Sequence, residues 1–197
     1  LLGELEKIRL LDERGHLDFV NEIRWTEKEN VEKRDGVDIK TIDLNNTEKV
    51  GLEISRDPEV IGLIRKWNGG NAFKKLTRNS INAAGAVGIL SIKKTDRHAY
   101  IHGGRMVERL WLKANLLGLA FQPVSASVFM YARCMEGKGE GLDKSSYSRF
   151  MALRPAFEKF FLKNSGEREL FIFRLSVSEK IAVKSLRKPL NEMFYYL

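Results

Sequence analysis

Apolar residues recur at helical spacing through residues 103–119, and this is the strongest pattern in the chain. The apolar positions are Met106, Val107, Leu110, Trp111 and Leu117, with Ala114 as the small member. Leu112 and Leu116 add a second apolar flank, which predicts a helix buried on more than one face. A glycine pair precedes the pattern and Gly118 follows it, so we expect the helix to lie between these glycines. Such a helix is either the central element of a fold or a subunit interface.

Two further segments have the composition of interior strands. Residues 83–92 are apolar and rich in small side chains, which predicts a strand buried on both faces. Residues 169–177 are apolar on both sides of an extended chain, with Phe171, Phe173 and Leu175 on one side and Leu170 and Ile172 on the other. This second segment is therefore expected in the interior of a sheet.

The remaining segments are mainly helical. Residues 1–25 predict one or two helices with a break at Gly15, and residues 26–34 predict a solvated loop or helix end. A short extended arm is expected after the Asp35-Gly36 turn.

Two helices have clear sequence signals. Asp57-Pro58-Glu59 is a strong helix start, and Asn68-Gly69-Gly70 is its expected end. Residues 145–163 predict a helix with five apolar side chains on one face: Phe150, Leu153, Phe157, Phe160 and Phe161. The order of elements predicts an α+β fold in one domain over residues 1–197. Residues 1–80 form its helical and extended N-terminal portion, and residues 81–197 form the core with a basic tail.

Composition narrows the class of protein. Apolar residues at 43% and charged residues at 30% are typical of a globular protein, and no apolar run is long enough for a membrane span. Cys134 is the single cysteine, which excludes an internal disulfide and favours a reducing, cytoplasmic location. The N-terminus has neither a starting Met nor a secretory signal, so we expect the tail of a longer polypeptide or a trimmed chain.

No catalytic or metal-binding motif stands out. The three histidines lack the spacing of metal ligands, and neither a Walker loop nor a Gly-x-Ser-x-Gly motif occurs. Arg133 beside Cys134 would favour a reactive thiolate, but a lone cysteine is more often a small buried hydrophobe. The net charge of +8 is dispersed among 26 acidic residues, which argues against nucleic-acid binding and leaves a phosphate-bearing cofactor as the expected anionic ligand.

The sequence of residues 103–123 resembles that of the central helix of the flavin-dependent nitroreductase family. Its pattern is Gly-Gly-Arg-x-x-x-Arg-x-Trp-Leu, followed by Gly118-Leu119-Ala120-Phe121-Gln122-Pro123. The variant with Arg-x-Trp-Leu and Gln-Pro is similar to nitroreductase-like modules at the C-terminal end of ThiF-type adenylyltransferase fusions. The resemblance implies a mixed sheet flanked by helices and a homodimer formed through the central helix.

The resemblance also implies a binding site for FMN. The turn after the helix would face the flavin ring, which assigns Gln122, Pro123, Val124, Ser125 and Ala126 to the cofactor. The segment Lys184-Ser185-Leu186-Arg187-Lys188-Pro189-Leu190 is similar to the closing segment of the family, which assigns Lys184, Arg187 and Lys188 to the FMN phosphate. NAD(P)H would reduce the flavin, and a small electrophilic acceptor would reoxidise it in a ping-pong cycle.

Two parts of the family pattern do not occur in this chain. The Arg-rich N-terminal segment with its Pro-Ser-x-x-Asn-x-Gln-Pro-Trp-like turn is missing, and residues 125–127 lack the glycine that follows the proline in the family. The site is therefore half a site, completed by upstream sequence or degenerate. The alternative function is a catalytically silent dimerisation or regulatory module attached to a ThiF-type adenylyltransferase.

Overall fold

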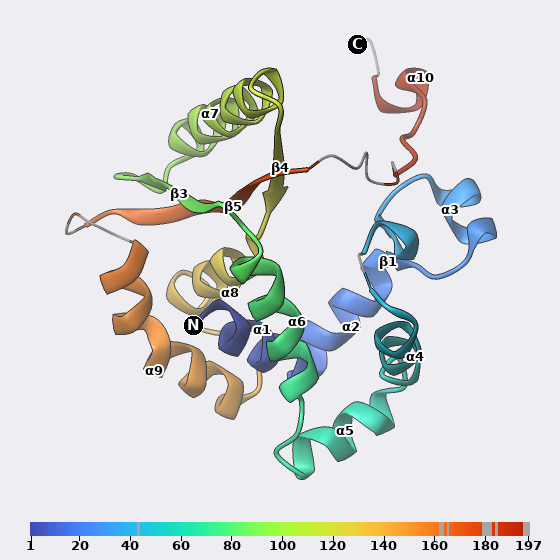
Figure 1. Ribbon diagram of the computed structural model, residues 1–197. Coiled ribbons are helices and arrows are strands. Elements are labelled where there is room, and N and C mark those ends of the chain that lie inside the picture. The colour runs from blue at the N-terminus through green and yellow to red at the C-terminus, as the bar shows by residue number, and fades with distance from the viewer. Residues whose placement is uncertain (43, 162–163, 165, 179–182, 184, 195–197) are drawn as a thin grey trace.

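The computed structural model describes residues 1–197 except 43, 162–163, 165, 179–182, 184 and 195–197 (Figure 1). The N-terminal part contains α1 (Leu2–Leu11), α2 (Glu13–Glu22), β1 (Ile23–Arg24), α3 (Glu27–Lys33), β2 (Val37–Asp38), the 3-10 helix η1 (Ile39–Thr41), α4 (Asn46–Ile54), α5 (Pro58–Lys66) and α6 (Asn71–Asn82). The rest contains β3 (Ala86–Ile92), α7 (Arg97–Leu116), β4 (Leu119–Pro123), α8 (Ala126–Met135), α9 (Lys144–Phe161), β5 (Arg168–Val177) and α10 (Leu190–Met193). The α+β class is confirmed.

The main sheet has three antiparallel strands in the order β3-β5-β4. Helix α7 lies on one side of this sheet, and α8, α9 and α1 lie on the other (Figure 1). Strand β5 is the middle strand, as its two apolar sides predict. Strand β3 was expected to be buried on both faces, and this is wrong: it is an edge strand in which no residue is fully buried.

A β-bulge near Leu170 changes which side chains of β5 share a face. The register passes from Leu90 opposite Phe171 to Ser91 opposite Glu169, so Leu170 has no partner in β3. Leu170 contacts Gly103 of α7, where a Cβ atom would lie only 2.0 Å from its Cδ2. The prediction that Leu170 shares a side with Ile172 is therefore wrong, because a bulge was not foreseen.

Helix α7 begins six residues earlier than predicted. Asp96 caps it by accepting a hydrogen bond from the backbone N–H of Ala99 at 2.8 Å, and the glycine pair lies inside the helix. Trp111 stacks on Phe121 with ring centroids 4.8 Å apart, and Phe121 stacks on Phe173 at 4.6 Å. Within this chain only Gly103 and Ala114 of α7 are fully buried, so the expected burial on a second face does not occur here.

The N-terminal part is more helical than the sequence suggested. Asp12, rather than Gly15, separates the first two helices, and its carboxylate accepts a hydrogen bond from Gly15 N at 3.0 Å. Helices α3, α4 and α6 lie where a loop or no element was expected. Helix α5 has the predicted Asp57 cap and Pro58 start. A separate apolar cluster holds this region together and comprises Leu10, Leu11, Ile23, Leu52, Ile61 and Phe73.

A buried ion pair joins α9 to the end of β5. The Arg154 guanidinium donates to both carboxylate oxygens of Glu169, one of them at 2.9 Å, and its Nε donates to Glu158 at 2.8 Å. The side chains of Arg154 and Glu169 are only 6% and 3% exposed. The guanidinium carbon also lies 4.8 Å and 5.4 Å from the ring centroids of Tyr131 and Phe157, which adds cation–π contacts to the ion pair. Phe160 of the same helix is 76% exposed, contrary to its predicted place on the buried face.

Replacing Glu169 by Gln should therefore be strongly destabilising. It leaves the buried Arg154 charge without its principal partner, and breaking a buried pair costs about 3–5 kcal/mol. Glu158→Gln is the matched control, because that partner is half exposed and a surface pair contributes at most about 1 kcal/mol. Urea denaturation of the two variants measures the difference, and equal losses of stability would contradict this assignment.

Candidate functional site

The predicted flavin-facing turn is divided between three elements. Gln122 and Pro123 belong to strand β4 rather than to a turn, since β4 pairs with β5 through Pro123 opposite Phe173. Val124 and Ser125 connect the strand to α8, and Ala126 is the first residue of that helix. The five predicted residues therefore run from the end of β4, through a two-residue connection, to the first residue of α8.

Ser125 ties this connection to the central strand. Its hydroxyl donates to the carbonyl of Ile172 at 2.9 Å and accepts from the N–H of Ile172 at 3.0 Å. The N–H of Val124 donates to the same carbonyl at 2.8 Å. Ser125 is buried, so its hydroxyl is a structural group rather than one directed at a ligand. Gln122 is exposed, and its side-chain oxygen accepts from Arg174 Nε at 2.5 Å.

The basic tail lies at the opposite end of the sheet. Strand β5 leaves the sheet at Val177, opposite Leu119 at the beginning of β4, whereas the predicted turn follows the other end of β4. In Figure 1 the tail then runs toward β1 and α3. There, Lys188 lies 4.0 Å from the Asp35 carboxylate, and Arg187 donates to the carbonyls of Ser185 and Leu186. Lys184 lies outside the described residues, so its predicted role has no structural counterpart here.

The structure therefore does not bring the two predicted groups of site residues together within one described chain. The ring-facing connection and the basic tail are each present, at separate places.

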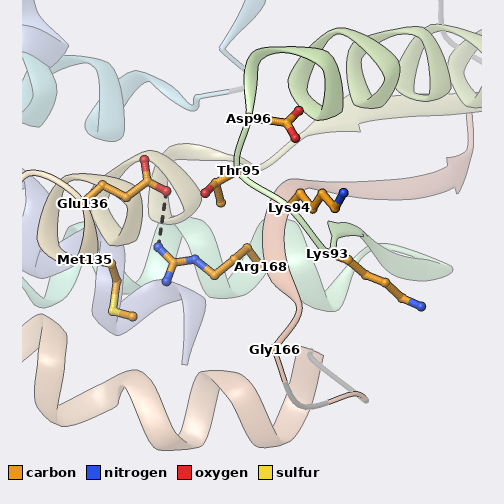
Figure 2. Close-up of a pocket in the computed structure, with 8 residues that line it drawn as sticks. All are labelled: Lys93, Lys94, Thr95, Asp96, Met135, Glu136, Gly166 and Arg168. Atoms are coloured by element: carbon orange, nitrogen blue, oxygen red, sulfur yellow. Dashed lines mark hydrogen bonds and ion pairs between the residues drawn. The ribbon is translucent and has the colours of Figure 1, made fainter.

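An open hollow that the sequence did not indicate lies where β3 leads into α7. It has a volume of about 670 Å³ and is lined by Lys93, Lys94, Thr95, Asp96, Met135, Glu136, Gly166 and Arg168. Figure 2 shows Arg168 directed at Glu136, with 3.3 Å between Nη2 and Oε1, while the two lysine side chains extend away from this pair. Tyr100 donates to Glu136 at 3.5 Å, and its burial and the Glu136 charge raise its pKa.

A second hollow, of about 400 Å³, adjoins the first between β3 and α7. It is lined by Leu90, Ser91, Ile92, Lys93, Lys94, Ala99, His102, Gly103 and Met106. The two lysines line both hollows, and no carboxylate lies within 4.0 Å of either ammonium group in the part of the chain that the structure describes. The larger hollow arises from tertiary packing, since residues 93–96, 135–136 and 166–168 meet there, whereas the smaller hollow is lined by residues 90–106 alone.

Cys134 is not positioned as a nucleophile. Burial raises the pKa of its thiol to about 11, against the opposing effect of Arg133. The alternative interpretation of this cysteine as a small buried hydrophobe is the one that its surroundings support. Across the described ranges, no group of three or more His, Cys, Asp or Glu side chains is arranged to hold a metal ion. No helix in those ranges has the length and apolarity needed to cross a membrane.

Comparison with known proteins finds a relative that is longer than this chain, and it shows no family. An uncharacterized protein of Mycobacterium tuberculosis, MT1398, is 27% identical over 191 residues, which are 95% of this chain and 26% of that protein. The chain thus spans about a quarter of the length of this relative. No protein-family model matches the sequence, and no solved structure matches it.

The role of Ser125 predicts a contrast with its neighbour Ser127. Ser125→Ala should lower stability by about 1–3 kcal/mol, because the backbone N–H and C=O of Ile172 lose a buried partner. Ser127 is also buried, but its hydroxyl has no hydrogen-bond partner among the described residues, so Ser127→Ala should be neutral or stabilising. Thermal unfolding of both variants tests this. An unchanged melting temperature of Ser125→Ala would contradict a structural role for the Ser125 hydroxyl.

Proposed function

We propose that this chain is the dimerising part of an FMN-dependent, nitroreductase-like oxidoreductase. The observation that carries the proposal is a row of exposed apolar side chains on the outer side of α7. Ile101, Leu112 and Leu116 are 56%, 57% and 81% exposed and share one side of the helix by its 3.6-residue period, with Arg105 and Arg109 among them. Exposed apolar patches of this kind mark interaction sites, and a second copy of α7 would cover this one. The inner face of the helix, with Trp111, is already used on the sheet.

The described residues after β4 suit the ring end of FMN better than its phosphate end. Ser125 precedes α8 without capping it by a side-chain hydrogen bond, and the N–H of Val128 already donates to the Ser125 carbonyl, so a ligand would be bound by the N–H groups of Ala126 and Ser127. Gln122 and Pro123 are exposed beside it. FMN bound there would supply the hydride chemistry, with NAD(P)H as donor and a small electrophile as acceptor. The chain's own part would be to orient the ring through backbone donors and to exclude water from one of its faces.

The phosphate end requires residues from elsewhere. Arg187 and Lys188 lie in the tail, away from the turn of the same chain, so their proposed contact with the phosphate would be made across the dimer. Upstream sequence would supply the remaining contacts, as the absent Arg-rich segment implies.

A second candidate function is a catalytically silent dimerisation or regulatory module beside a ThiF-type adenylyltransferase. Two observations favour it: the Ser125 hydroxyl and the Gln122 side-chain oxygen are both occupied by β5, and Lys188 lies beside Asp35. Flavin absorbance in the purified longer polypeptide separates the two functions, because a silent module would be colourless.

The dimer is tested by placing a charge on the exposed face of α7. Leu112→Lys should shift the chain from dimer to monomer in sedimentation, because a buried, unpaired ammonium is costly at an apolar interface. Ile54→Lys on α4 is the matched control, since Ile54 is equally exposed at 58% and lies outside the proposed interface. A monomeric wild-type chain, or identical behaviour of the two variants, would refute the dimer through α7.

The cofactor is tested in the longer polypeptide with a tail variant. Arg187→Ala should weaken FMN binding by about 1.5–3 kcal/mol, the range for a hydrogen bond to a charged group. Arg65→Ala, an exposed arginine of α5, is the control and should leave the affinity unchanged. Fluorescence titration of FMN measures the affinity of both variants.

The 197-residue chain alone should bind FMN weakly or not at all, because half of the protein's contacts with FMN are missing.

A further inference from the structure

Strand β3 presents one backbone edge with which no other described strand pairs. It is the outermost strand of the order β3-β5-β4, and among the described residues its pairing partners lie in β5. About half of its N–H and C=O groups point away from β5, as they do in any edge strand. In Figure 1, β3 runs along one margin of the sheet beneath α7.

This edge carries little of the protection that natural edge strands have. Edges are usually shortened or blunted with charged residues or proline. Strand β3 has seven residues, Ala86–Ile92, and none of them is charged or proline. Its single irregularity lies between Leu90 and Ser91, which leaves the first five residues regular. The other edge strand, β4, is shorter and ends in Pro123.

The surroundings of the edge define what would pair with it. The 400 Å³ hollow between β3 and α7 is walled by Leu90, Ile92 and Met106, which suits apolar side chains of an added strand. Lys93 and Lys94 follow the end of β3, and their ammonium nitrogens lie more than 4.0 Å from every carboxylate oxygen of the described residues. The pKa of the Glu167 carboxyl is lowered mainly by hydrogen bonds from Asn164 and Ser91, and the charge of Lys93 makes only a smaller contribution.

We propose that β3 is completed by an additional strand from the longer polypeptide, outside these 197 residues. That segment would be extended and apolar, with an acidic residue opposite Lys93 and Lys94. The relative MT1398 has roughly three-quarters of its length outside the matched region, which is ample chain to supply such a strand. The resulting four-stranded sheet would cover the hollow and satisfy the outward N–H and C=O groups of β3.

Hydrogen exchange of the β3 amides tests the proposal directly. In the 197-residue chain, the outward amides of residues 86–92 should exchange at least 10-fold faster than those of the middle strand β5. In the longer polypeptide they should slow by at least 10-fold, while β5 serves as an internal measure of folding. Equal exchange of β3 in the two polypeptides would overturn the proposal. Protection that appears in the 197-residue chain and rises with its concentration would assign the edge to a second copy instead, and would also overturn it.

The charge complementarity is tested with a double variant of the longer polypeptide. Lys93→Glu/Lys94→Glu should accelerate exchange of β3 at least 3-fold, because the acidic residue of the added strand would then be repelled. Lys28→Glu/Lys33→Glu on α3 makes the same charge change at exposed positions away from β3 and should have no effect there. Equal exchange in the two double variants would refute an acidic partner for the lysines.

Discussion

The fold depends on strand β5, which is paired on both edges and packed by helices on both faces. It forms hydrogen bonds to β3 on one edge and to β4 on the other, and helices lie against both of its faces. Each neighbouring element is attached to β5 by a specific contact. Ser125 binds the backbone of Ile172, the guanidinium of Arg154 binds Glu169, and Gly103 allows α7 to approach Leu170. The contacts of Ser125 with Ile172 and of Arg154 with Glu169 are polar and directional. They therefore specify which element packs at which position along β5, in addition to stabilising the fold.

The sequence predicted the elements whose side chains have one dominant environment. The double apolar character of residues 169–177 identified the middle strand, and the Asp57-Pro58 signal identified the start of α5. It failed where a local pattern depends on a distant partner. Strand β4 is a strand only because β5 pairs with it, and the bulge that moves Leu170 to the α7 side exists only in the register with β3. The cap that begins α7 at Asp96 was a readable local signal that a prominent glycine pair obscured.

The candidate site was predictable only as separate pieces. The motif that ends at Pro123 leads into a strand-to-helix connection. There, the Ser125 hydroxyl and the Gln122 side-chain amide form hydrogen bonds to β5, which the spacing of residues along the sequence does not reveal. The larger hollow beside α7 could not be predicted from the sequence, since Lys93 and Arg168 are far apart along the chain and meet through the β3–β5 pairing. Exposed leucines on α7 have a simple reason in this setting: the 3.6-residue period records an apolar surface, but it does not say whether the same chain covers it.

The separation of β3 and β5 along the chain has a consequence for biosynthesis. Ala86 pairs with Leu175, about 90 residues later, and α7, β4, α8 and α9 are all made in between. Because the chain leaves the ribosome at about 5–20 residues per second, β3 waits several seconds or more for its first partner. During that interval an uncharged strand and a leucine-rich helix are both in solvent. Nascent chains of this protein should therefore be clients of chaperones that bind apolar segments, until the last strand emerges.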